Sequence, residues 1–492
     1  RLHGRRRMAP VLAVLACGAA SRGLSAGLDF GTSGVRIAVA EAAAGDRSQA
    51  PSVVFSAKQP LQGGGGPADW LSALDGLFGA VPADIKSQLA HVGVSGTSAT
   101  SLVVDRGARE GVERPVTRGP RRYDLSVLRE PCGAEALERI AAWAPEGHTV
   151  RAPTSSLAKL VAWTLEEPLG PTEAFCHQSD FVVATLTGQW APVASDWHNA
   201  LKLGFDVADG ALRYPDWMDG LLGSLPGDRR PDLPEVRMPG EQVGHACAAA
   251  CARWGLPTKT CAVHAGTTDS IAAFIAATGG LAPPGSAVTS LGSTLAIKLV
   301  STTKVDDVAS GVYSHRLGAH FLVGGASNCG CAALAERFSP EDLARLSEEI
   351  DPEQDMDLGY VPMAAGTVGE RFPRPDPEAR QRLAPQPESD SAFLHGAFYA
   401  LAALEADAFR TLESLGASRV EAILSCGGGA QNPVLTRMRE RLISESGPVR
   451  MLQAAEGEAS YGAAVLALRA GEFGGDGGGG GSASYEVRPL GS

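Results

Sequence analysis

The stretch Gly27-Leu28-Asp29-Phe30-Gly31-Thr32-Ser33-Gly34-Val35-Arg36-Ile37-Ala38-Val39 decides the fold. It predicts a strand, a tight glycine-rich turn and a second strand, with Asp29 just before the turn. Glycines allow positive φ and a close approach of the backbone, so their N–H groups can face a phosphate. A carboxylate beside such a turn can hold Mg²⁺ or bind a sugar hydroxyl. Taken alone, the pattern also fits an ordinary β-hairpin.

The same layout returns in the second half of the chain, as Ala287-Val288-Thr289-Ser290-Leu291-Gly292-Ser293-Thr294-Leu295-Ala296-Ile297-Lys298. An apolar strand again enters a small polar turn and leaves as another apolar strand. Two such hairpins, one in each half, indicate duplicated domains that close on a nucleotide. The length of 492 residues exceeds what one core usually holds and agrees with two or three domains.

Composition describes a globular chain with a large core, because 44% of the residues are hydrophobic and 20% are charged. A net charge of −12 argues against a nucleic-acid-binding surface. The nine cysteines are an odd number scattered over a long chain, which favours a reducing compartment over a disulfide framework. The spacing of Cys247, Cys251, Cys261 and His264 matches no common zinc site, so we expect them to be buried packing residues.

Residues 1–26 contain several arginines, serines and alanines and no acidic residue. This composition predicts an organelle transit peptide over residues 1–23 and a chloroplast location, with the cytoplasm as the alternative. The apolar run from Ala9 to Ala20 imitates a secretory signal but is too short to span a bilayer. No other segment reaches membrane-spanning length without charge, so we expect no membrane partner. The glycine-rich residues 471–492 are expected to form a flexible tail.

Strands and helices alternate along the rest of the chain, which predicts an α/β fold with helices on both faces of a sheet. In Val263 to Phe274 a strand, a Gly-Thr-Thr turn and a helix follow one another, with Asp269 where the helix begins. A helix N-terminus favours an ionised carboxylate and can also hold a phosphate. Further expected elements are a strand at 91–96 with a small polar turn at 97–100, a helix at 155–165 that contains Lys159, an interdomain break at 281–285, a glycine-rich turn at 324–328 and a helix at 395–415.

Near the C-terminus, Ile423-Leu424-Ser425-Cys426-Gly427-Gly428-Gly429-Ala430-Gln431-Asn432-Pro433 predicts a strand that enters a triple-glycine turn before a helix. With this motif the chain resembles the FGGY carbohydrate kinases over roughly residues 24–470. Four segments carry the resemblance: Leu28-Asp29-Phe30-Gly31-Thr32-Ser33, Gly266-Thr267-Thr268-Asp269, Leu291-Gly292-Ser293-Thr294 and Gly427-Gly428-Gly429-Ala430-Gln431-Asn432. Each is weak alone, and their order across two halves makes the combination specific.

The resemblance implies a fold of two actin-like ATPase (ribonuclease H-like) domains with a cleft between them. Residues 24–275 would form the sugar-binding domain and residues 276–470 the ATP-binding domain, with a hinge near 275–286 that closes over both substrates. Asp269 would be the general base that takes a proton from the terminal hydroxyl of the sugar. Asp29 would contact Mg²⁺ or the sugar beside the transferred phosphate. The implied small molecules are ATP, Mg²⁺ and a sugar, and the oligomeric state is left open.

The resemblance also assigns the remaining phosphate and nucleotide contacts. These fall to Gly31, Thr32 and Ser33 in the first hairpin, to Gly292, Ser293 and Thr294 in the second, and to Gly427, Gly428, Gly429, Gln431 and Asn432 around adenine and ribose. The alternative for every one of these residues is that it only makes or caps a turn, and the same alternative applies to Asp29 and Asp269.

The sugar-binding segment departs from the usual pattern. Typical xylulokinases of this family carry Gly-Gln-Met-His-Gly where this chain reads Gly93-Val94-Ser95-Gly96-Thr97-Ser98-Ala99-Thr100. Without the Met-His pair, the chain looks like the plant and cyanobacterial branch associated with phosphorylation of D-ribulose. Thr97 or Ser98 would then bind a sugar hydroxyl, unless the threonine faces the core. The alternatives are a kinase for D-xylulose, glycerol or another polyol, and a non-catalytic ATP-binding regulatory protein, which would be expected to have lost Asp269.

Overall fold

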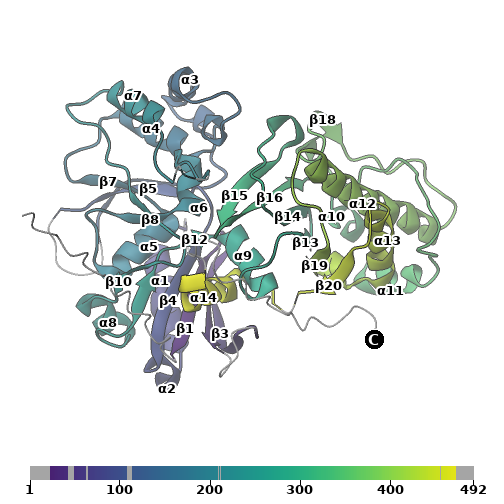
Figure 1. The fold of residues 1–492 in the computed structure, drawn as a ribbon, viewed down its shortest axis with the longest axis horizontal. Coiled ribbons are helices and arrows are strands. Elements are labelled where there is room, and N and C mark those ends of the chain that lie inside the picture. The colour runs from purple at the N-terminus through teal and green to yellow at the C-terminus, as the bar shows by residue number, and fades with distance from the viewer. Residues whose placement is uncertain are drawn as a thin grey trace, which may run out of the picture.

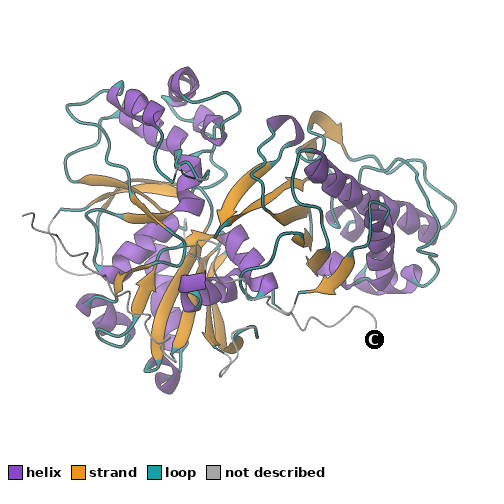
Figure 2. Ribbon diagram, viewed as in Figure 1, coloured by secondary structure: helices purple, strands orange, loops and turns teal. Residues whose placement is uncertain are grey.

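The computed structural model describes residues 23–42, 49–61, 65–107, 114–208, 210, 212–454 and 456–472, and they form two α/β lobes (Figure 1). Almost all of the predicted transit peptide and most of the predicted tail lie outside the described residues. Figure 2 shows that helices lie on both sides of the strands in each lobe, as the alternating pattern predicts. Among the described residues, no helix is both long and apolar enough to cross a membrane.

The N-terminal lobe runs as far as residue 278. Its elements are β1 (Leu24–Phe30), β2 (Gly34–Glu41), β3 (Ser52–Pro60), α1 (Pro67–Ala80), α2 (Ala83–Lys86), β4 (Leu89–Gly96), β5 (Ser101–Asp105), β6 (Val116–Arg121), α3 (Gly133–Trp143), α4 (Ser156–Glu166), β7 (Glu173–His177), α5 (Gln178–Thr187), β8 (Ala194–Asp196), α6 (Trp197–Ala200), α7 (Asp216–Gly223), β9 (Glu235–Arg237), β10 (Gln242–His245), α8 (Ala248–Trp254), β11 (Ala262–His264), β12 (Thr267–Thr268) and α9 (Asp269–Thr278), with short 3₁₀ turns η1 (Val127–Arg129), η2 (Thr149–Arg151) and η3 (Leu201–Leu203).

The C-terminal lobe begins at residue 286. It contains β13 (Ser286–Leu291), β14 (Leu295–Ser301), β15 (Tyr313–Leu317), β16 (His320–Ser327), α10 (Ala332–Ala335), α11 (Pro340–Ser347), β17 (Val368–Glu370), β18 (Asp376–Arg380), α12 (Asp390–Ser414), β19 (Ala422–Cys426), α13 (Pro433–Ser444) and β20 (Arg450–Gln453), with 3₁₀ turns η4 (Val308–Ser310) and η5 (Gly428–Gln431); α14 (Ala459–Leu468) and η6 (Ala470–Glu472) follow.

The two main sheets share one topology. In the first, the strand order is β10-β11-β4-β1-β2-β3, and in the second it is β15-β16-β14-β13-β19-β20. In both, an antiparallel hairpin (β1–β2 and β13–β14) has a parallel strand beside its first member (β4 and β19). The predicted α/β class and the predicted repetition of the strand–turn–strand layout are confirmed.

Helices α9 and α14 form the layer between the two sheets (Figure 1). Side chains of α9 pack with Val288, Val300 and Leu424 on one face of the C-terminal sheet. Helix α14, although it follows the C-terminal lobe in sequence, packs on β1, β4 and β2 of the N-terminal sheet. Small residues make this approach possible, because a Cβ atom on Gly27 of β1 would lie 1.9 Å from the carbonyl oxygen of Ser460.

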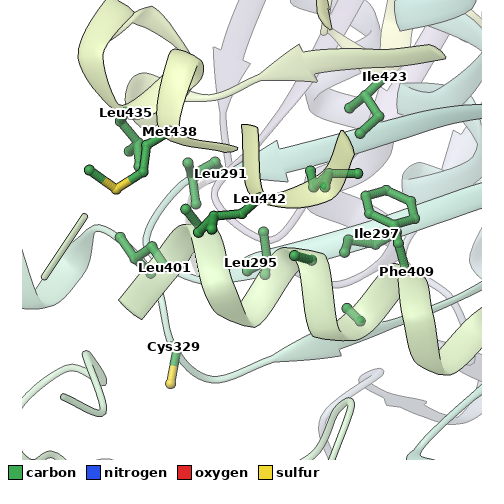
Figure 3. Close-up of a cluster of buried hydrophobic side chains, with 14 of the residues drawn as sticks. Leu291, Leu295, Ile297, Cys329, Leu401, Phe409, Ile423, Leu435, Met438 and Leu442 are labelled. Atoms are coloured by element: carbon green, nitrogen blue, oxygen red, sulfur yellow. The ribbon is translucent and has the colours of Figure 1, made fainter. Parts of the chain in front are cut away.

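The core of the C-terminal lobe lies between its sheet and the helices α12 and α13. Figure 3 shows Leu401 and Phe409 of α12 beside Leu291, Leu295 and Ile297 of the hairpin that carries the second predicted phosphate turn. Because this packing buries the strands on either side of the turn, the turn itself is held at a fixed place on the lobe. A separate cluster of buried residues in the N-terminal lobe lies around α3, α4 and α7.

Two expectations about local structure were wrong. Residues 324–328 do not form a turn, because β16 continues through Ser327 and Gly324 pairs with both Lys298 and Tyr313. The glycines there permit close packing, and a Cβ atom on Gly325 would lie 2.5 Å from the ring of Phe372. The long helix predicted from residue 395 begins at Asp390 instead, where the Ser389 side chain accepts a hydrogen bond from Ala392 N.

Candidate active site

Three parallel strands of the N-terminal sheet end side by side and carry polar residues in one row. Asp29 on β1 lies opposite Ser95 on β4, and Ser95 lies opposite Thr267 on β12. Ser95 Oγ donates a hydrogen bond to Asp29 Oδ1 at 3.0 Å. Neighbouring strands are about 5 Å apart and β4 lies between the other two, so Asp29 and Thr267 are two strand spacings, about 10 Å, apart at the same edge of the sheet.

Asp269 is the first residue of α9 and is half-buried. Its Oδ1 accepts a hydrogen bond from the Ser270 backbone N–H at 2.7 Å, which leaves Oδ2 without a hydrogen bond among the described residues. Burial raises the pKa of Asp269, whereas that hydrogen bond and the charges of Lys298 and Lys202 lower it. A carboxylate held by one oxygen and open at the other has the arrangement that a general base needs.

Asp29 is the more buried of the two carboxylates. Burial raises the pKa of Asp29 to about 6, and the charge of Asp269 adds to this, whereas the Ser95 hydrogen bond and the Arg36 charge lower it. Arg36 on β2 lies opposite Asp29, and its Nη1 is 3.3 Å from Asp29 Oδ2. The two predicted carboxylates thus lie within electrostatic reach of each other. Sequence reasoning did not identify Ser95 and Arg36, which contact Asp29.

Two lysines from different lobes flank Asp269, and sequence reasoning missed both. Lys202 lies in η3 of the N-terminal lobe, and Lys298 lies on β14. Neither has a hydrogen bond or ion pair with any described residue. Lys298 is opposite Val288, on the face of the sheet that packs on α9. Burial lowers the pKa of Lys298 to about 8, although the charge of Asp269 acts to raise it. A single lysine on an otherwise apolar strand face was the signal that could have found it.

His198 of α6 connects the base region to the other lobe. Its Nδ1 is 2.8 Å from Thr267 Oγ1 and its Nε2 is 2.6 Å from the carbonyl oxygen of Arg316 on β15. Because a carbonyl only accepts, Nε2 carries the proton and Thr267 donates to Nδ1. Burial lowers the pKa of His198 to about 3, so the ring stays neutral.

The turn that follows β4 separates the two predicted sugar-binding residues. The Thr97 hydroxyl donates to Gln178 Oε1 at 2.9 Å and lies 2.6 Å from Thr100 Oγ1. Its hydrogen-bonding groups are therefore occupied by other protein side chains. Ser98 Oγ is buried and has no hydrogen-bond partner among the described residues. A buried hydroxyl without a hydrogen-bond partner destabilises the folded protein, so Ser98 is a better candidate than Thr97 for a hydrogen bond to a ligand.

The predicted phosphate turns lie at the ends of their strands with exposed side chains. Thr32 and Ser33 are exposed in the β1–β2 turn, as are Ser293 and Thr294 in the β13–β14 turn. In each turn the leading glycine donates its backbone N–H back across the hairpin, from Gly31 to Gly34 O and from Gly292 to Thr294 O. The remaining groups that can meet a phosphate are the hydroxyls and the other backbone N–H groups of these turns.

The triple-glycine turn lies directly beside the second hairpin. Gly427 has φ of +90°, and a Cβ atom there would lie 2.6 Å from the carbonyl oxygen of Leu291, so glycine is required. Gly428 and Gln431 are exposed, and space is open above Gly428. Asn432 has a structural task, because its Oδ1 caps α13 at Leu435 N and its Nδ2 donates to Ser347. The sequence could not separate this cap from a nucleotide contact.

The two carboxylates suit a cation that is also bound by a phosphate of the substrate better than a cation that is bound by protein side chains alone. Within the described part of the chain, no group of three or more His, Cys, Asp or Glu side chains could hold a metal ion. Mg²⁺ in kinases is usually bound by one or two carboxylates, water and the phosphates of the substrate. Asp29 and Asp269 fit this role, because a cation near both would offset the repulsion that raises the pKa of Asp29.

Comparison with known proteins gives a family for the second lobe. Residues 287–471 match the C-terminal domain of the FGGY family of carbohydrate kinases. This range contains the second phosphate turn, Lys298 and the triple-glycine turn.

Solved structures resemble the whole chain. A xylulose kinase from Bifidobacterium adolescentis has a TM-score of 0.70 at 17% identity, over 96% of this chain and 96% of that chain. A xylulose kinase from Rhodospirillum rubrum has a TM-score of 0.67 at 22% identity, over 93% of this chain and 91% of that chain. A gluconate kinase from Lactobacillus acidophilus has a TM-score of 0.69 at 15% identity, over 92% of this chain and 90% of that chain. At these identities the likeness establishes the fold and does not select a sugar. The chain therefore has the two-domain actin-like fold that these kinases share, and residues 287–471 match the C-terminal domain of the FGGY carbohydrate kinases.

Proposed function

We propose that this protein is an ATP-dependent sugar kinase that phosphorylates the terminal hydroxyl of a pentulose, D-ribulose, and forms D-ribulose 5-phosphate. The observation that carries the proposal is the position of Asp269, which keeps one carboxylate oxygen free of hydrogen bonds to described residues, lies within electrostatic reach of Asp29 and is flanked by Lys298 of the lobe with the family match. The geometry of this site supports catalysis over a purely regulatory role, which would not need a base there.

Asp269 accepts the proton of the attacking hydroxyl as its oxygen bonds to the γ-phosphorus of ATP, while the bond from that phosphorus to the bridging oxygen breaks and ADP leaves. Asp29 would hold Mg²⁺, which when bound neutralises charge on the phosphates. Lys298 and Lys202 add positive charge beside the base, and this charge opposes the negative charge that develops on the transferred group. The exposed hydroxyls of Thr32, Ser33, Ser293 and Thr294 lie on the two turns where the phosphates of ATP would bind.

The choice of D-ribulose rests on the turn after β4. The segment Gly93 to Thr100 of this chain lacks the Met-His pair that typical xylulokinases carry there. Ser98 supplies the buried hydroxyl without a partner that a sugar hydroxyl could satisfy. D-xylulose is the second candidate, because xylulose kinases are among the solved structures with this fold.

The test is ATP consumption by the full chain with Mg²⁺ and, in turn, D-ribulose, D-xylulose, L-ribulose and glycerol. We expect the highest kcat/KM with D-ribulose. A higher kcat/KM with another sugar would keep the kinase and refute the choice of substrate. Hydrolysis of ATP that no sugar stimulates, or no turnover at all, would contradict the proposal and favour the regulatory alternative.

A further inference from the structure

Lys159, the fourth residue of α4, has a fully buried side chain. No carboxylate among the described residues lies within ion-pair distance of it. Its Nζ donates instead to two backbone carbonyl oxygens, that of Ala99 at 2.8 Å and that of Arg122 at 2.6 Å. A buried charge that lacks a counter-charge is expensive, so an ordinary packing position would hold an apolar residue. The groups to which this ammonium group donates therefore bear on its role in the protein.

The group that Lys159 holds is a strained peptide in the β4 turn. Ala99 has φ of +64°, a left-handed conformation that is unfavourable for a residue with a Cβ atom. Such a conformation persists where the surroundings over-determine it, and strain of this kind gathers at functional sites. The carbonyl oxygen of Ala99 accepts hydrogen bonds from Lys159 Nζ at 2.8 Å and from Ser101 Oγ at 3.1 Å, so both donors hold the residue that follows Ser98.

The rest of the turn is fixed from other sides. Gln178 accepts hydrogen bonds from both the backbone N–H and the hydroxyl of Thr97, at 2.9 Å each. Thr100 Oγ1 accepts a hydrogen bond from Tyr123 N at 3.0 Å. The turn is thus fastened at its first, third and fourth residues, and Ser98 is the member whose side chain has no partner among the described residues.

We propose that Lys159 is a positioning residue for the sugar, which acts through the Ala99 carbonyl to keep the Ser98 hydroxyl directed at the bound substrate. The inference rests on the proposed function, because it requires a sugar beside Asp29. Lys159 does not touch the sugar, and its effect reaches the sugar through the Ala99 residue, the peptide that joins it to Ser98, and the Ser98 hydroxyl.

The charge state of Lys159 gives this role a pH dependence. Burial lowers the pKa of Lys159 to about 7, with a further lowering from Lys202 and Arg121 and an opposing effect of Asp124. Above that pH the group becomes a neutral amine, whose hydrogen bonds to carbonyl oxygens lose their charge assistance. We therefore expect the KM for D-ribulose of the wild-type protein to rise as the pH passes above about 7.

The experiment is a double-mutant cycle with Lys159→Met and Ser98→Ala. Each single variant is expected to raise the KM for D-ribulose by about tenfold, the effect of roughly 1.4 kcal/mol, while the KM for ATP changes little. Because both changes disable the same contact, the double variant should be no worse than the worse single variant. In Lys159→Met the KM for D-ribulose should no longer depend on pH near 7. Lys86→Met, the same substitution on α2, is the matched control and should behave as the wild type.

Several outcomes would overturn the inference. A double variant whose effects multiply, or an equal rise in the KM for ATP, would mean that Lys159 acts only on general structure. If Lys159→Met does not fold, Lys159→Gln, which removes the charge and shortens the side chain while staying polar, completes the same cycle. The shift in melting temperature caused by D-ribulose, D-xylulose or glycerol separates the two proposals. A wild type that binds a sugar but does not phosphorylate it refutes the kinase, and the loss of that shift in Lys159→Met still tests the positioning role. A wild type that does neither refutes both.

Discussion

The imidazole of His198 and the main chain of Arg316 are joined by a hydrogen bond of 2.6 Å that connects the two lobes directly beside the predicted base. The same ring accepts a hydrogen bond from Thr267, two residues before Asp269. Any motion that separates the lobes along this seam has to break the first of these bonds, while the second keeps the ring attached to the strand end that precedes the base. His198 thereby links the relative position of the lobes to the position of the base.

Replacing His198 by leucine should open the free protein. The change removes the interlobe hydrogen bond and leaves a carbonyl and a hydroxyl without partners, at a cost of about 1–3 kcal/mol each where they stay buried. We expect a larger radius of gyration in small-angle scattering than for the wild type, and compaction when D-ribulose and ATP are added together. His245→Leu, on the exposed strand β10, is the control. Equal radii for the wild type and His198→Leu would show that the lobes are held by other contacts.

The substitution Asp269→Asn should abolish turnover with little effect on folding. An amide keeps the shape of the side chain but cannot accept the proton of the sugar, so kcat should fall by about 10²–10⁴-fold. The melting temperature and the affinity for ATP should stay near the wild-type values. Asp216→Asn is the matched control, because Asp216 is also the first residue of a helix and is exposed. A variant Asp269→Asn with normal kcat would mean that another group is the base.

The pH dependence of catalysis should have an acidic limb near pH 6. Asp29 has a raised pKa of about 6 in the folded protein and must be ionised to bind a cation or a sugar hydroxyl. The value of kcat/KM reports groups in the free enzyme, so it should fall as the pH drops through this value. Because Asp29 and Asp269 interact, the measured value belongs to the pair. A value of kcat/KM that stays constant down to pH 4.5 would contradict the raised pKa that we attribute to the burial of Asp29.

Lys298→Met should move that acidic limb to higher pH. The positive charge of Lys298 lowers the pKa of Asp269, so its removal leaves burial less opposed and the base is protonated at a higher pH. At neutral pH kcat should fall as well, because a cation beside the transferred group is lost. Lys304→Met, which disrupts only the surface ion pair with Asp306, should leave the profile unchanged. An unshifted profile in Lys298→Met would show that this lysine does not act on the base.

The sequence could predict the features that depend on neighbours along the chain. The hairpin β1–β2 follows from strand residues on both sides of Gly31 to Gly34, and Asp29 follows from its position before the turn. Asp269 follows from the Gly-Thr-Thr turn before a helix. These motifs combine chain geometry and chemistry within a few residues, so reading them requires no tertiary contact.

Features that depend on contacts between distant segments could not be predicted. Lys298 and Lys202 approach Asp269 from two lobes. A single lysine on an apolar strand face singles out Lys298, but the local sequence does not say that its charge acts on Asp269. The Thr97 and Ser98 hydroxyls are chemically alike in sequence, and only the position of Gln178 on α5 separates the occupied hydroxyl from the free one. In the same way, the composition of α14 shows that it is buried, but not that it lies on the sheet of the other lobe.

The substitution Gly27→Ala tests the packing of α14 on β1. A methyl group on Gly27 would lie 1.9 Å from the carbonyl oxygen of Ser460 and 2.3 Å from the backbone nitrogen of Ala464, so α14 would have to move away from β1. Overpacking of this kind costs about 1–3 kcal/mol, and we expect the free energy of unfolding to fall by at least that amount in urea titration. Gly79→Ala is the control, because Gly79 is exposed near the end of α1 with no atom within 4 Å of an added Cβ. There alanine should stabilise the helix by up to about 1 kcal/mol. An unchanged stability of Gly27→Ala would refute the close approach of α14 to the strand that carries Asp29.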